Sequence, residues 1–171
     1  VDNGAADYQW RAWHNAAAQI LSERIFAPVM GNHECYGEDW FNALPEGYLN
    51  QFSLPDKKYF YSFDYGAAHF AILNTQFAEL NKFNPKLRDA QEYFFRRDVA
   101  NANRIWKIVF MHKDIYDYGQ DKFNDIAENF LELFDELEID LVFTGHLHTY
   151  RNRGKIFARQ KSARGTTYIL C

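Results

Sequence analysis

The sequence has few cysteines, no long apolar run and no excess of positive charge, and each absence excludes a class of protein. Two cysteines, Cys35 and Cys171, are too few for a disulfide framework, and we interpret both as free thiols. No apolar run reaches the roughly 20 residues of a membrane span, so we expect no membrane association. A formal net charge of −4 provides no overall basic field that would attract nucleic acid.

The composition is that of a packed globule. Hydrophobic residues make up 47% of the chain and aromatic residues 18%, which argues against disorder. A length of 171 residues without repeats or linker-like stretches predicts a single domain over residues 1–171. A phosphate-binding site in such an acidic chain needs a local source of positive charge, which metal ions can supply.

Apolar periodicity predicts an alternation of helices and strands. Helical spacing predicts helices over residues 7–23, 87–102 and 122–137. Short apolar runs predict strands over residues 25–30, 58–65, 68–74, 105–111 and 141–144, and strands that close the sheet follow around Gly154 and Gly165. This order predicts an α/β fold with helices flanking mixed β-sheet.

Three of the predicted strands end in a polar loop that contains histidine. The loops are Gly31-Asn32-His33-Glu34, His112-Lys113 and Gly145-His146-Leu147-His148. Ligands of open α/β sheets bind beyond the carboxyl ends of the strands, so we expect these loops to converge. Each loop alone has an ordinary explanation, as a surface histidine or a turn residue. Together they favour a metal site, in which two histidines one residue apart address two neighbouring ions.

These loops resemble, in order and context, the last three signature blocks of the calcineurin-like metallophosphoesterase superfamily. The likeness extends over essentially the whole chain. The residues after His112, together with Tyr150, Arg151 and Arg153, are similar to the purple-acid-phosphatase-like branch. The resemblance implies a metallophosphoesterase-type α/β sandwich and favours an extracytoplasmic protein, because members of that branch are often found there.

The resemblance also implies roles for individual residues. Asn32, His112 and His146 would bind one metal ion, called here the second, and His148 would bind the first; Zn, Mn or Fe suits such ligands. His33 would act as a general acid beside the leaving oxygen, with Asp2 as its orienting partner. The implied reaction is hydrolysis of small phosphomonoesters or phosphodiesters by a metal-bridging hydroxide.

The chain also departs from the family pattern. The family's Asp-x-His block and its bridging Asp are absent, so we expect an N-terminally incomplete catalytic domain that lacks its first strands. Such a chain would bind at most one metal ion weakly and would have little activity alone. Asp114 replaces a proline of the related branch, which predicts either a less rigid His112 loop or an extra carboxylate near the site.

Two other functions stay open at this point. One is a nuclease of the same fold, because basic residues gather near the end of the chain: Arg151, Arg153, Lys155, Arg159, Lys161 and Arg164. The other is a non-catalytic fragment or interaction domain with a degenerate metal site. A Cys35 nucleophile is weaker, because it lacks a third orienting group. We interpret the aromatic residues Trp40, Phe41, Tyr48 and Phe52 as core and cap packing rather than as a substrate-stacking wall.

Overall fold

Helices and strands alternate along the chain in a computed structural model that describes residues 1–55, 59–120 and 122–171. The helical elements are α1 (Asp7–Glu23), a 3-10 turn (His33–Cys35), α2 (Glu46–Gln51), α3 (Phe77–Leu80), α4 (Leu87–Asn101) and α5 (Asp125–Glu136). The strands are β1 (Tyr61–Tyr65), β2 (Ala68–Ile72), β3 (Trp106–Phe110), β4 (Leu141–Thr144), β5 (Arg151–Phe157), β6 (Gln160–Lys161) and β7 (Thr166–Leu170). The α/β class predicted from the sequence is confirmed.

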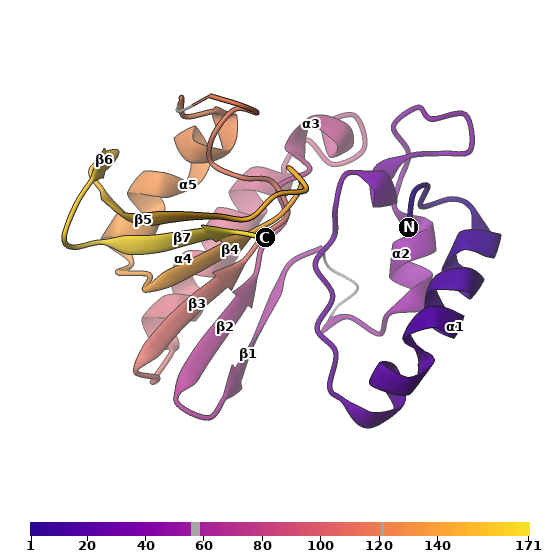
Figure 1. Cartoon of the computed structure of the whole chain (residues 1–171), viewed down its shortest axis with the longest axis horizontal. Coiled ribbons are helices and arrows are strands. Elements are labelled where there is room, and N and C mark those ends of the chain that lie inside the picture. The colour runs from indigo at the N-terminus through magenta and orange to yellow at the C-terminus, as the bar shows by residue number, and fades with distance from the viewer. Residues whose placement is uncertain (56–58, 121) are drawn as a thin grey trace.

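The described strands form one mixed sheet in the order β1-β2-β3-β4-β7-β5-β6. Its centre is parallel, since β2 pairs with β3, β3 with β4, and β4 with β7 in parallel register. Antiparallel pairs, β1 with β2 and β5 with β7, extend it on both sides. Parallel neighbours need crossover connections, and α4 and α5 provide the ones before β3 and β4. Figure 1 shows the sheet separated from the part of the chain that contains α1 and α2.

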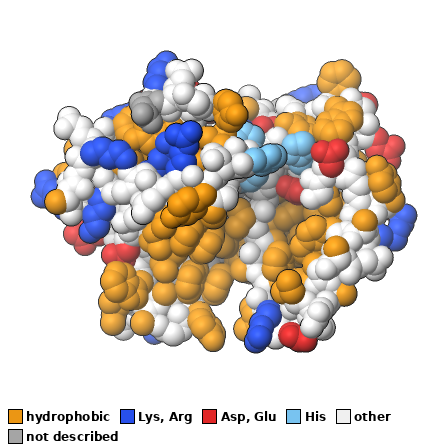
Figure 2. Space-filling model, viewed as in Figure 1, with side chains coloured by type: hydrophobic (Ala, Val, Ile, Leu, Met, Phe, Trp, Pro, Cys, Tyr) orange, Lys and Arg blue, Asp and Glu red, His pale blue; other side chains and the backbone are white. Residues whose placement is uncertain are grey.

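The two faces of the sheet are packed differently. One face carries Val109, Val142 and Tyr168, which are fully buried in a core with the apolar sides of α4 and α5. The opposite face carries four phenylalanines whose rings form a row with successive centroid distances of 5.1, 6.4 and 4.9 Å: Phe63, Phe70, Phe110 and Phe143. Figure 2 shows hydrophobic side chains gathered over this part of the sheet.

The strand predicted over residues 25–30 is wrong. This segment is extended but pairs with no strand in the described chain, and Ile25 is 91% exposed. Pro28 cannot donate a ladder hydrogen bond, and its carbonyl instead accepts hydrogen bonds from the hydroxyls of Tyr48 (3.2 Å) and Tyr61 (2.8 Å). Side chains therefore fix this segment, which leads into the first histidine loop.

The other predicted elements are present with small differences at their ends. The helix over residues 7–23 and the strand over residues 141–144 match α1 and β4. The predicted hairpin is β1 and β2, with Gly66 at a positive φ of 59° in its turn, although Lys58 lies outside the described residues. Within the described chain, no helix is long and apolar enough to cross a membrane.

Candidate metal centre

Two of the histidine loops meet because their strands are parallel neighbours. His112 follows β3 and His146 follows β4, and the register pairs Phe110 with Phe143 near the carboxyl ends of the two strands. The loops are also joined directly, because the Gly145 amide donates a hydrogen bond of 2.8 Å to the His112 carbonyl. The sheet therefore sets the distance between the two imidazoles.

Asn32, in the first histidine loop, completes a compact cluster with His112 and His146. Its Oδ1 lies 2.9 Å from His112 Nε2 and 3.1 Å from His146 Nδ1, and the two ring nitrogens are 3.2 Å apart. Asn32 Nδ2 donates to the Tyr36 hydroxyl at 3.0 Å, which turns Oδ1 toward the imidazoles. The structure thus brings together three of the residues singled out in the sequence. Figure 2 shows histidine side chains grouped in the hollow between the two parts of the molecule.

The three atoms fit a single transition-metal ion. Donors about 2.1 Å from a common ion lie roughly 3.0–3.4 Å apart at octahedral or tetrahedral angles, which agrees with the observed separations. Gly31 leaves room for the ring, since a Cβ at that position would lie 3.0 Å from His112 Cε1. The described residues contain no metal-binding group of three His, Cys, Asp or Glu side chains. The cluster has only two such residues, and its third donor is an amide oxygen.

The surroundings of the two imidazoles keep them neutral. Burial, reinforced by the neighbouring His146 and Lys113, lowers the pKa of His112 to about 3. Burial and Lys113 also lower the pKa of His146. Neutral imidazole is the form that ligates metals, so both rings present lone pairs without competition from protons at neutral pH.

His148 lies near enough to this cluster for its charge to act on both His112 and His146. It lines a separate cavity of about 210 Å³ together with Tyr118, Gln120 and Arg151. His146 and His148 have positive φ angles of 73° and 49°. This left-handed conformation is uncommon for residues other than glycine and is often retained at functional sites. The bend of this loop therefore resides in the histidines themselves, which the sequence did not reveal.

His33 is held by Asp2, chiefly through the backbone. His33 Nδ1 lies 2.6 Å from the Asp2 carbonyl oxygen, whereas the Asp2 carboxylate is 3.7 Å away and its side chain is 70% exposed. The nearby Cys35 is fully buried, and burial raises its pKa well above the usual range for a thiol. A neutral, buried thiol is a poor nucleophile, which agrees with the interpretation of Cys35 as an ordinary free thiol.

Asp114 connects the two histidine loops through its buried side chain. Its side chain is 1% exposed, accepts a hydrogen bond of 3.1 Å from the Thr144 hydroxyl and pairs with Arg153 at 2.5 Å. Asp114 is two residues after His112, and Thr144 is two residues before His146. The carboxylate is therefore committed to the interior, and it ties the loop that a proline would otherwise stiffen. The sequence alone did not distinguish this arrangement from the alternatives.

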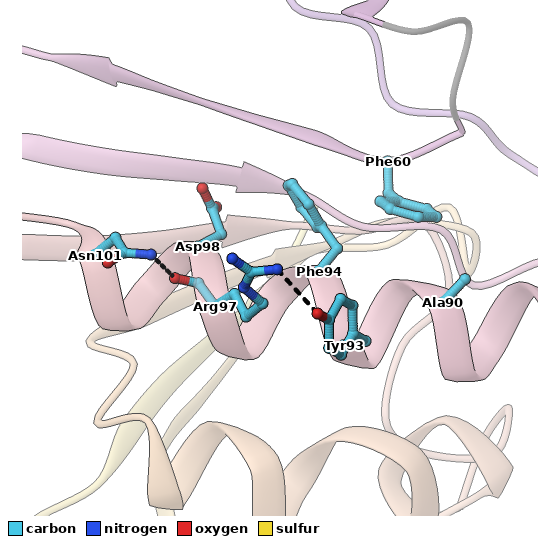
Figure 3. A pocket seen from close by; sticks show the side chains of 7 residues that line it. All are labelled: Phe60, Ala90, Tyr93, Phe94, Arg97, Asp98 and Asn101. Carbon is cyan, nitrogen blue, oxygen red and sulfur yellow. Dashed lines mark hydrogen bonds between the residues drawn. The ribbon is translucent and has the colours of Figure 1, made fainter.

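A larger cavity lies elsewhere and contains none of the candidate residues. Its volume is about 420 Å³, and its lining is largely apolar, with Phe60 facing Tyr93 and Phe94 of α4 (Figure 3). Arg97 and Asn101 line its other end, but their side chains hydrogen-bond to the Tyr93 hydroxyl and the Arg97 carbonyl. It offers no convergent donor set, so the histidine cluster is the better candidate site.

The sequence is similar to a known protein family and to several named proteins. The sequence profile of the calcineurin-like phosphoesterase family matches residues 1–150. Purple acid phosphatase 23 of Arabidopsis thaliana is 25% identical over 94% of this chain and 36% of its own length. Phosphoenolpyruvate phosphatase of Allium cepa is 25% identical over 86% of this chain and 32% of its own, and purple acid phosphatase 15 of Arabidopsis thaliana is 24% identical over 95% and 31%.

The chain spans about a third of the length of these relatives. Its sheet and flanking helices are consistent with the fold of the matched family. The profile match covers all three histidine loops, and the resemblance first seen in those loops is thereby confirmed. The chain belongs to the calcineurin-like phosphoesterase family.

Proposed function

We propose that this protein hydrolyses small phosphoesters at a metal centre built on Asn32, His112 and His146. The observation that carries the proposal is the convergence of their three donor atoms within 3.2 Å of one another. Membership of the phosphoesterase family and the phosphatase names of the relatives support it. We propose Zn, Mn or Fe as the metal, since nitrogen and oxygen donors suit these ions.

The residues divide between holding the metals and moving a proton. Asn32, His112 and His146 would hold the second ion, and His148, on the neighbouring cavity, would belong to the first. Bound together, two such ions supply an activated hydroxide and neutralise phosphate charge. His33 is engaged at Nδ1 by the Asp2 carbonyl, so its Nε2 is the atom that would pass a proton to the leaving oxygen.

A small phosphoester is favoured over a nucleic acid because much of the basic cluster is engaged within the protein. Arg153 is buried against Asp114, and Arg159 pairs with Glu128. The Arg164 guanidinium stacks over the Phe157 ring at 4.0 Å. Side chains engaged in intramolecular contacts do not form a continuous groove for a phosphate backbone. We therefore consider a nuclease the second candidate function.

The proposal is tested by measuring metal content and the hydrolysis of 4-nitrophenyl phosphate together. The three converging donors are two imidazoles and one amide oxygen, with no negative charge among them, so we expect the chain alone to hold at most one ion weakly and to turn over slowly. His146→Ala should lose metal and activity together. In a longer chain that also contains the family's Asp-x-His block and bridging Asp, His33→Ala should keep its metal and lose roughly 10²–10⁴-fold in turnover, as expected of a general acid.

The outcomes separate the assigned roles. Asp2→Asn should have a milder effect than His33→Ala, because the backbone carbonyl of Asp2 makes the shorter contact with His33. Loss of metal from His33→Ala would show that His33 is a ligand. Full metal content in His146→Ala would contradict the proposed centre.

A further inference from the structure

We propose that Trp40 forms a stacking surface for the leaving group and makes this protein prefer phosphoesters of aromatic alcohols. The inference rests on the proposed function, because it uses the position of His33 beside the reacting phosphoryl group. It also revises the interpretation of Trp40 and Phe41 as packing residues, since they are 53% and 75% exposed.

The loop that carries Trp40 is fixed by its own backbone. The amide of Gly37 donates to the Phe41 carbonyl and the amide of Trp40 donates to the Gly37 carbonyl, each at 2.9 Å. Tyr36 and Asn42 form an antiparallel bridge across the loop. Asn3 Nδ2 donates to the Gly37 carbonyl at 2.6 Å and anchors the loop to the start of the chain. The position of Trp40 is therefore set before any ligand arrives.

Trp40 itself is held in an unfavourable conformation at the surface. Its φ is 64°, in the left-handed region that bulky residues rarely adopt. Such a conformation persists where the surrounding structure over-determines it, as the hydrogen bonds of this loop do. An indole that is half exposed gains little from core packing, so burial does not account for its place here.

The exposed indole lies against the proposed general acid. Its ring centroid is 6.1 Å from that of His33 at an interplanar angle of 87°, and Tyr36 contacts both rings at 5.4 and 6.0 Å. The Tyr36 hydroxyl also accepts the hydrogen bond from Asn32 Nδ2, which links these rings to the histidine cluster. The indole is close enough to His33 for the alcohol whose oxygen takes the His33 proton to extend over this surface.

Stacking on an aromatic ring favours a planar leaving group over an alkyl one. Aromatic contacts of this kind contribute free energy beyond the area that they bury. The inference therefore names a substrate class: phosphoesters of phenolic or heteroaromatic alcohols. Phe41, the next residue, is the matched control, because it is also an exposed aromatic residue in the same loop.

The test compares two probes, phenylphosphonate and methylphosphonate, which are not hydrolysed. Their affinities for the chain in Zn²⁺ would be measured by calorimetry on the original protein, Trp40→Gly, Trp40→Phe and Phe41→Ala. Glycine tolerates the positive φ, so Trp40→Gly removes the ring without adding backbone strain. We expect about tenfold tighter binding of phenylphosphonate, lost in Trp40→Gly and retained in Trp40→Phe and Phe41→Ala.

The results distinguish this inference from the proposed function. Equal affinities of the original protein for both phosphonates would overturn the inference and leave the metal centre standing. A preference that survives in Trp40→Gly, or disappears in Phe41→Ala, would also overturn it. If neither phosphonate binds, the proposed function fails and the inference fails with it.

Discussion

Two histidines on or beside neighbouring strands of the same sheet have pKa values that are shifted in opposite directions. His69 lies on β2 and is 5% exposed, and His112 follows β3, the next strand. Hydrogen bonds to Asp98 and Asp64 raise the pKa of His69, whereas burial lowers the pKa of His112 to about 3. The raised pKa favours the cationic form of His69, whereas the lowered pKa keeps His112 a neutral ligand candidate.

The difference lies in the neighbours as well as in the burial. His69 Nδ1 is 2.8 Å from an Asp64 oxygen and Nε2 is 3.0 Å from an Asp98 oxygen. Two carboxylate acceptors require both ring nitrogens to donate, which only the imidazolium can do. His112 instead has the amide oxygen of Asn32 and a second imidazole as hydrogen-bond partners, and within the described residues no carboxylate hydrogen-bonds to it. Hydrogen-bonded carboxylates thus hold His69 between structural elements, whereas the ring nitrogen of His112 faces neutral groups.

The largest expected effect that would test this comparison comes from removing His112. We expect His112→Ala to lower metal affinity and phosphoesterase activity by more than about 100-fold, the upper range for residues that merely support a metal ligand. Its free energy of unfolding should change less, because the ring that is removed is neutral and hydrogen-bonds to neutral polar groups. Metal titration and chemical denaturation of the same variant would measure both. Retained metal affinity would show that His112 is as structural as His69.

Removing His69 should give the reverse pattern. His69→Ala leaves Asp98 without its partner and breaks two charge-assisted hydrogen bonds between α4, β1 and β2, so we expect a loss of about 3 kcal/mol in the free energy of unfolding. Metal affinity should stay within about twofold of the original protein, because His69 lies at the opposite end of the strands. Urea denaturation and metal titration measure the two quantities. A variant that loses metal but not stability would reverse the assigned roles.

The sequence predicts the helices and strands more accurately than it predicts the surroundings of individual side chains. Periodicity located β4 and α1, because an apolar pattern of fixed period reports directly on burial. The run over residues 25–30 failed because its apolar residues are in part buried, Met30 among them, without strand pairing in the described chain, and composition does not distinguish such a segment from a strand. The joint pattern of three histidine loops pointed to His112 and His146 because parallel strands bring their carboxyl ends together.

Other features of the site depend on contacts that the sequence does not specify. The pairing of Asp64 with His69 can be predicted from the sequence, since the two residues face each other across the hairpin turn at Gly66. The third partner, Asp98, comes from a helix 29 residues further along the chain. The burial of Asp114 and the left-handed conformations of Trp40 and His146 likewise arise from tertiary packing. No local spacing reports on them.

Placing a carboxylate beside His112 would sharpen the comparison. In Asn32→Asp, a charged oxygen replaces the amide oxygen that lies 2.9 Å from His112 Nε2. We expect the pKa of His112 in the metal-free protein to rise by about one to three pH units toward the behaviour of His69. An NMR titration of the ring protons in a chelator measures it, with Glu34→Asp as a control that keeps the local charge. An unchanged pKa would mean that burial alone governs His112.

The smallest expected effect is the pH dependence of stability that His69 contributes. Because its pKa is raised in the folded protein, its stabilising effect is complete below the pKa of unfolded histidine and is lost as pH rises through the folded value. The loss should be about 1 kcal/mol, since Asp64 is 39% exposed, also pairs with Arg104, and is screened by solvent. His69→Gln, which cannot be protonated, should lack this decline. Urea denaturation of both proteins between pH 6 and 9 isolates the contribution of His69 protonation to the free energy of unfolding, because the two proteins share all other titrating groups. Parallel curves would show that His69 carries no additional proton in the folded protein, and the contrast with His112 would then rest on geometry alone.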